Sequence, residues 1–287
     1  MIEEFLSSWA LFHNAYLAGW LIAVVLGLSG VLVVARNHIF IGAAIAQAST
    51  LGMALGMWIG AAIGVEAAGS DHVHGLLSLV GVAFAVVAAL VTARDGDGSA
   101  REAVTGWVFL ATASLAILVL AHSPHGLEEI HHLVSSSIIG ATRTDVWLFA
   151  ALAAIALAAV ALARPRLILF ATDPAMAAAV GMRAGMWSAM LAAWLGLVIG
   201  LALRVTGLLF TFGTLVLPAL AAAALCKETA TMFWAAPLIA FGCSAIGFVL
   251  ANHYDDPPGQ MGVAVQALAV ALIWLARRKA IDDRWRS

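Results

Sequence analysis

Residues 204–225 read RVTGLLFTFGTLVLPALAAAAL, and this stretch decides the fold class. After Arg204 it carries no formal charge for 21 residues, enough for a helix to cross a bilayer core of about 30 Å. It also contains Gly207 and Pro218, and proline lacks the N–H that a helix needs, so a helix here bends or breaks. Lipid tolerates such a break only where protein or a water-filled cavity covers the freed backbone groups. The stretch therefore predicts a broken helix that lines a path, or a kinked helix that only packs.

The composition places the whole chain in a membrane. Of its 287 residues, 63% are hydrophobic and 10% are charged, which is too little charge to cover the surface of a soluble domain. Cys226 and Cys243 lie in or at the end of apolar runs, which favours neither a disulfide framework nor a zinc knuckle. The opening residues, MIEEF, lack the basic region of a cleaved signal, so we expect the first span to be retained.

The apolar runs predict an all-α, polytopic transmembrane bundle that forms one domain over residues 1–287. We expect eight to nine spans, because 206–225 is either a crossing or a re-entrant segment. With the N-terminus outside, 12 of the 14 Lys and Arg residues fall inside, and only Arg143 and Arg204 fall outside. This bias predicts an N-out, C-in topology. The predicted spans are 15–35, 39–64, 76–93, 103–121, 146–163, 186–203, 206–225, 232–251 and 261–276.

The predicted outer loop, 122–145, is rich in histidine and acidic residues. If 127–133 is helical, Glu128 shares a face with His131 and His132. Imidazole and carboxylate suit a borderline divalent cation such as zinc. A transient cation site and an ordinary solvated face both fit this pattern, and the missing second shell favours the solvated face.

The predicted inner loop, 164–185, contains a short helix. Thr172 or Asp173 can cap it, Pro174 suits its first position, and Gly181 can end it. The segment between them is nearly all alanine, with no stripe of large apolar residues to bury. It is therefore either a docking element for a cytoplasmic partner or a capped turn between two spans.

Two enzymatic functions are disfavoured by the motifs. The phosphate loop GxxxxGK[ST] does not occur, so the chain does not hydrolyse a nucleotide by that route. Residues 27–30 read GLSG, which matches an intramembrane serine protease motif. No histidine lies mid-span to act as the base, so Ser29 and its glycines favour close helix packing.

Four stretches in order resemble one family, the membrane permease subunits of bacterial zinc/manganese ABC importers. The resemblance covers roughly residues 15 to 277. The stretches are RNHIFIGAAIAQASTLGMALG (36–56), similar to the family's R…fGDxlaHasLlGvaxG; DPAMAAAVG (173–181), similar to DpelAxxxG; Arg204, Gly207, Pro218 and Ala219, which fit KxvGxlLxxallviPaaxA; and DDPPG (255–259), similar to D-x-P-x-G.

The resemblance implies a multi-pass permease in the bacterial cytoplasmic (inner) membrane, not itself an enzyme. It implies a second permease copy, identical or different, two cytoplasmic ATPase subunits that bind ATP, and an extracytoplasmic metal-binding protein. The cargo would be a divalent metal, with no covalent cofactor and no nucleic acid. The helix 173–181 would dock on the ATPase through Asp173, Pro174, Ala177 and Gly181. Arg36 and Arg204 each precede a glycine-interrupted span, which also suits inverted internal repeats.

The chain departs from the family where an Asp and a His would face the path. Those positions are Ala43 and Gln47 here, and neither is as good a ligand for a divalent cation. Three interpretations stay open: the path uses few protein ligands, other groups take over, or the cargo is not a bare ion. The candidate metal or outer-mouth residues are Gln47, Asp255, Asp256, His131 and His132, with Met53 and Met57 as further candidates or as packing residues, and Gly207 and Pro218 as the helix break beside the path.

We therefore expect the permease subunit of an ATP-binding-cassette importer for zinc or manganese. One alternative is an ion-coupled secondary carrier, which the lack of acidic residues deep in any span disfavours. The other is a membrane enzyme built on Ser29 or on the histidines of residues 122–132.

Overall fold

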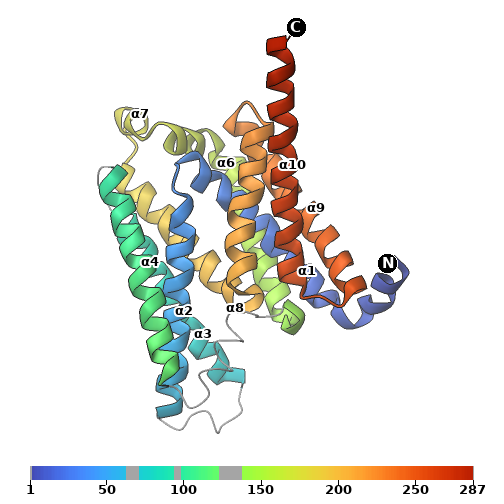
Figure 1. Cartoon of the computed structure of the whole chain (residues 1–287). Helices are drawn as coiled ribbons and strands as arrows, with labels where there is room; N and C mark the ends of the chain where they lie inside the picture. Colours follow the sequence, from blue (N-terminus) through green and yellow to red (C-terminus); the bar gives the residue numbers. More distant parts are fainter. Residues whose placement is uncertain (1, 63–70, 94–97, 123–137, 287) are drawn as a thin grey trace. The chain divides into compact units, whose positions relative to one another are not determined.

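The computed structural model describes residues 2–62, 71–93, 98–122 and 138–286, and in these ranges the regular structure is entirely helical (Figure 1). The predicted all-α fold class is confirmed. The helices are α1 (Ile2–Ala35), α2 (Ile39–Ala62), α3 (Asp71–Thr92), α4 (Gly98–Ala121), the 3-10 turn η2 (Ile138–Gly140), α6 (Arg143–Thr172), α7 (Pro174–Ala179), α8 (Ala184–Leu225), α9 (Thr229–Tyr254) and α10 (Pro258–Arg286).

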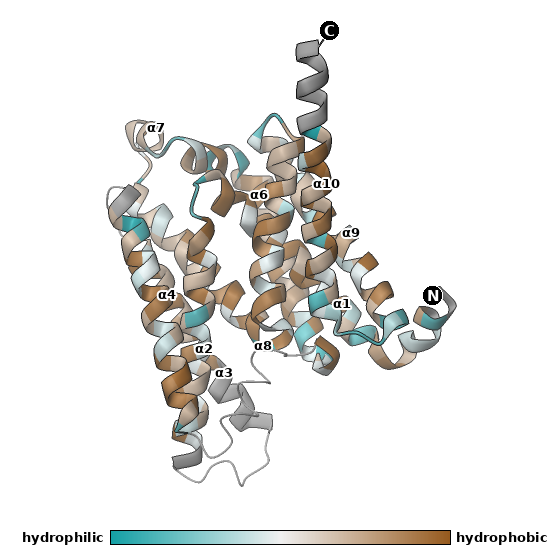
Figure 2. Cartoon of the chain, in the orientation of Figure 1, coloured by the Kyte–Doolittle hydropathy of each residue, from teal (hydrophilic) through white to brown (hydrophobic). Residues whose placement is uncertain are grey.

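Within the described ranges, seven helices are long and apolar enough to cross a membrane. Figure 2 shows mostly apolar residues along them, with hydrophilic residues gathered toward helix ends and turns. One of the seven, α8, has 42 residues, about twice the length needed to cross a core of about 30 Å. It contains both predicted spans 186–203 and 206–225, while Leu79–Thr92 of α3 is a shorter apolar segment. The number of crossings and the N-out, C-in orientation stay predictions.

The break in α8 lies at Gly207. Its φ of 75° and ψ of 175° are non-helical and belong to a region that glycine adopts without steric cost. The Thr206 hydroxyl donates to the Ala202 carbonyl at 3.0 Å and lies 3.0 Å from the Thr211 hydroxyl. These buried hydroxyls therefore form hydrogen bonds next to the point where the backbone hydrogen bonds of α8 are interrupted. Pro218, in contrast, lies inside the helix without a second non-helical residue, so the break is at the glycine.

The contacts divide the chain into two compact units. Unit 1 comprises residues 1–37, 137–171 and 213–287. In it α9 packs against both α1 and α10 (Figure 1). The helix backbones approach each other closely at two glycines. A methyl group on Gly30 of α1 would overlap the Leu215 carbonyl oxygen of α8, and one on Gly247 of α9 would lie 2.5 Å from the Gly262 Cα of α10. Small residues permit this approach between membrane helices, so the packing interpretation of Gly27–Gly30 agrees with the structure.

Unit 2 comprises residues 38–136 and 172–212. Here α2 packs against α3 and α4, with Ala44, Ala48 and Val108 in a shared core (Figure 1). A methyl group on Gly81 would lie 2.6 Å from the Met53 side chain, and Met53 is only 8% exposed. Met53 therefore packs between α2 and α3.

The predicted loop 164–185 was wrong in its first half, because α6 continues through Pro165 to Thr172. Within unit 1, the Arg164 guanidinium donates to the Ala230 carbonyl at 3.1 Å. The Arg36 guanidinium lies 4.3 Å from the centre of the Phe170 ring, a cation–π distance. These contacts stabilise residues 164–172 as a continuation of α6, although the arginines and the proline in this segment are typical of a loop.

Candidate functional site

The least buried face of α2 contains Ala43, Gln47 and Thr50, which are spaced by one helical turn. Their neighbours Ala44 and Ala48 are fully buried. The Thr50 hydroxyl donates to the Ala46 carbonyl at 3.0 Å, so its polarity is satisfied within the helix. The Gln47 amide forms no hydrogen bond with any residue in the described ranges. This face therefore offers one free amide and no charged group.

The predicted helix 173–181 is confirmed as a capped element, α7. The Met176 N–H donates to the Asp173 carboxylate at 2.9 Å, Pro174 is the first helical residue, and Gly181 has a φ of 86°. The cap is thus Asp173 rather than Thr172, because Thr172 still belongs to α6.

The surface of α7 is apolar. Ala177 is buried, whereas Met176 is 52% exposed and Val180, just beyond the helix, is 61% exposed. Exposed apolar side chains on a short helix suit contact with another protein.

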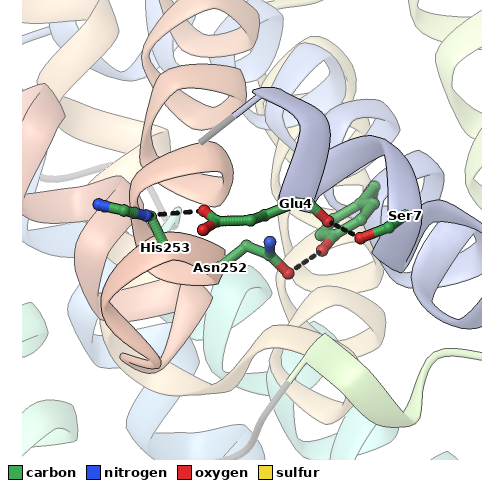
Figure 3. Close-up of polar contacts among 5 residues, drawn as sticks. Glu4, Ser7, Asn252 and His253 are labelled. Carbon is green, nitrogen blue, oxygen red and sulfur yellow. Dashed lines mark hydrogen bonds and ion pairs between the residues drawn. The ribbon is translucent and has the colours of Figure 1, made fainter.

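At the predicted outer end of unit 1, polar contacts tie the start of α1 to the end of α9 (Figure 3). His253 Nδ1 donates to the Glu4 carboxylate at 2.8 Å, and the Tyr16 hydroxyl donates to the Asn252 amide oxygen at 3.2 Å. The Tyr16 ring also lies 4.6 Å from the ring of Phe5 and 6.0 Å from that of Phe248. The hydrogen bond from His253 holds the pKa of Glu4 below its ordinary value of 4.5.

We expect acid to release the first turns of α1. A carboxyl whose pKa is lowered by folding stabilises the fold above its ordinary pKa, and this contribution is lost as the pH falls through the lowered value. Hydrogen exchange of residues 4–13 should therefore speed up below pH 4.5. The Glu4→Gln variant should show fast exchange without that acid transition. An equally sharp transition in the variant would contradict the role of Glu4. Because both side chains are exposed, the effect is small.

The predicted metal residues are not brought together in the described structure. Asp255 has a φ of 60° and ends α9, and the N–H groups of Asp255 and Asp256 both donate to the Ala251 carbonyl. Both carboxylates are exposed. Within the described ranges, no three His, Cys, Asp or Glu side chains are placed to hold a metal ion. His131 and His132 lie outside the described residues, so their proposed role stays a prediction.

A polar cluster in unit 1 was missed by the sequence analysis. The Gln266 amide of α10 donates to the Thr214 hydroxyl of α8 at 3.1 Å and to the Ser244 hydroxyl of α9 at 3.3 Å. Gln266 is 1% exposed and the other two are fully buried. A lone glutamine in the middle of an apolar span was the available signal, because polar groups inside membranes seek partners.

The long apolar helices define a polytopic helical membrane protein, in which α7 is a capped short helix and α8 is broken at a glycine. The sequence profile described as the ABC 3 transport family matches residues 8–277. The chain belongs to this family, which confirms the predicted resemblance. It is accordingly a multi-pass protein of the inner membrane.

Named relatives cover nearly the whole chain. It is 25% identical to the manganese import system permease protein ScaB of Streptococcus gordonii, over 93% of each chain. It is 23% identical to the chelated iron transport system membrane protein YfeD of Yersinia pestis, over 95% of this chain and 88% of that one.

Two solved structures share the fold. PsaBC from Streptococcus pneumoniae in complex with Fab matches with a TM-score of 0.77 and 19% identity, covering 96% of this chain and 95% of that chain. An inward-facing conformation of a putative metal-chelate type ABC transporter matches with a TM-score of 0.75 and 13% identity, covering 93% and 88%.

Proposed function

We propose that this chain is the transmembrane permease subunit of an ATP-driven importer for a transition metal, with manganese or zinc as the metal. The observation that carries the proposal is α7, a capped helix with exposed Met176 and Val180, in a chain without a phosphate loop. Such a helix gives a separate cytoplasmic ATPase a surface to contact. The names of the relatives, which concern manganese and iron, support a metal cargo.

In the proposed assembly, ATP binds to two cytoplasmic ATPase subunits, and a second permease copy completes the membrane part. Asp173, Pro174, Ala177 and Gly181 fix the shape of the coupling element. An extracytoplasmic binding protein delivers the metal to the outer face, where Asp255 and Asp256 lie under the predicted topology. The break at Gly207 lies beside the path, because a broken membrane helix requires cover from protein or water.

The test is metal uptake by cells that have the chain and cells that lack it. We expect deletion of the chain to abolish the ATP-dependent uptake of manganese or of zinc, and reintroduction of the chain to restore it. An ATPase subunit should purify with the tagged permease from detergent extracts. Unchanged uptake of both metals would contradict the cargo, and a permease that purifies without an ATPase would favour the secondary carrier.

A further inference from the structure

The amide of Gln266 lies deep within the membrane-spanning part of unit 1. Gln266 is the ninth residue of the 20-residue span Pro258–Arg277, and it is 1% exposed. Its hydrogen-bond partners, Thr214 of α8 and Ser244 of α9, are fully buried. Three helices therefore meet at one polar junction, which consists of these three side chains and is covered by protein.

The carbonyl half of the Gln266 amide has no partner at this junction. A glutamine amide has two N–H donors and one carbonyl oxygen that accepts. Gln266 Nε2 uses both donors, to the Thr214 hydroxyl at 3.1 Å and to the Ser244 hydroxyl at 3.3 Å. Gln266 Oε1 is buried and accepts no hydrogen bond from any residue in the described ranges. A buried acceptor of this kind is costly inside a membrane unless a donor reaches it.

The two hydroxyls of the junction also have a proton left to donate. Hydroxyls elsewhere in the spans, such as those of Ser29 and Thr112, donate to the carbonyl four residues earlier in their own helix. The hydroxyls of Thr214 and Ser244 make no hydrogen bond with a described residue other than the two that they accept from Gln266. The junction therefore has one unused acceptor beside two unused donors.

Close helix contacts on either side limit the size of any molecule that could complete the junction. A methyl group on Gly213, the residue before Thr214, would lie 2.9 Å from the Val263 side chain of α10. One on Gly247 of α9 would lie 2.5 Å from the Cα of Gly262. These contacts lie within about one helical turn of the three polar side chains. Only a very small molecule that both donates and accepts hydrogen bonds suits the junction.

We propose that Gln266, Thr214 and Ser244 form a binding site for a single buried water molecule. The water donates to Gln266 Oε1 and accepts from the two hydroxyls, which gives it the three or so hydrogen bonds typical of a buried water. A metal cation suits the site less well, because all three side chains are neutral and a charge at this depth requires a charged partner. The hydrated junction ties the part of α8 in unit 1 to α9 and α10. The inference is independent of the proposed function.

A direct test is a structure of the full-length chain at a resolution that shows ordered waters. We expect a water about 2.7–3.2 Å from Gln266 Oε1, within hydrogen-bond distance of at least one of the two hydroxyls. A junction in which Gln266 Oε1 contacts only carbon atoms would overturn the inference.

A Gln266→Met variant tests the same site by its effect on stability. Methionine keeps the length of the side chain and removes the amide. If the water completes the network, the midpoint of thermal unfolding in detergent should fall by about 2–4 °C. If no water binds, the variant removes an unpaired buried carbonyl, and the midpoint should stay constant or rise. That second result would overturn the inference.

A second substitution tests whether the three side chains act as one site. Combined with Gln266→Met, a Ser244→Ala change should lower the midpoint by less than the sum of the two single effects, because both disrupt the same network. Fully additive effects would contradict a shared water. Thr112→Val is the matched control, since the Thr112 hydroxyl is bonded within its own helix. A loss in the control as large as that in Gln266→Met would also overturn the assignment.

Discussion

A Met176→Arg variant is expected to lose metal uptake while it keeps its fold. The Met176 side chain is 52% exposed on α7, so a charged replacement meets water in the isolated permease and costs little stability. In the complex, the same arginine would be buried against the ATPase. A central interface residue of this kind contributes about 2 kcal/mol or more, so binding should weaken about thirtyfold.

The measurement is the amount of ATPase that purifies with the tagged permease, together with ATP-dependent uptake in cells. Met176→Leu is the matched control, because it keeps an apolar side chain of similar size at the same site. We expect the control to retain both properties. A Met176→Arg permease that reached normal abundance and retained its ATPase and its uptake would show that α7 is not the coupling surface.

A Gly30→Ala variant should fail to accumulate as folded protein. The added methyl group would overlap the Leu215 carbonyl oxygen and lie 3.3 Å from the Ala219 Cβ. The first of these is backbone, which cannot rotate away as a flexible side chain can, so α1 and α8 would have to separate locally. Overpacking of this kind costs about 1–3 kcal/mol, and more where the backbone must move.

Gly106→Ala is the control for this prediction. A methyl group on Gly106 of α4 meets no atom within 4 Å, and alanine is the better helix former by about 1 kcal/mol. The two variants should therefore differ in membrane abundance and in the midpoint of unfolding in detergent. Equal midpoints would mean that the contact at Gly30 is looser than the structure indicates.

The positions of most helices could be predicted because an apolar run of about 20 residues has few alternatives in a membrane. The N-terminal cap of α7 could also be predicted from the sequence, since Asp173 and Pro174 have specific roles at a helix start. In both cases the deciding chemistry is local. The family could be predicted from four motifs in order, because they span most of the chain.

The remaining features depend on contacts distant in sequence. Proline is the stronger helix breaker in water, yet α8 breaks at Gly207 and passes through Pro218. The extension of α6 beyond Arg164 depends on contacts with Ala230 and with Arg36, which no local pattern reveals. Gln266 was visible as a polar residue in a span, but its partners on α8 and α9 were not.

The glycines differ in how much space a side chain would have at each position, and this difference decides where a reporter group can be attached. Cys226 and Cys243 are the only cysteines in the sequence. Replacing both of them would therefore give a cysteine-free chain for thiol labelling. Gly106, Gly185 and Gly242 have open space where a side chain would begin, and cysteines placed there should accept a spin label or fluorophore. Cysteines at Gly30 or Gly247 would force the helices apart before any label arrived.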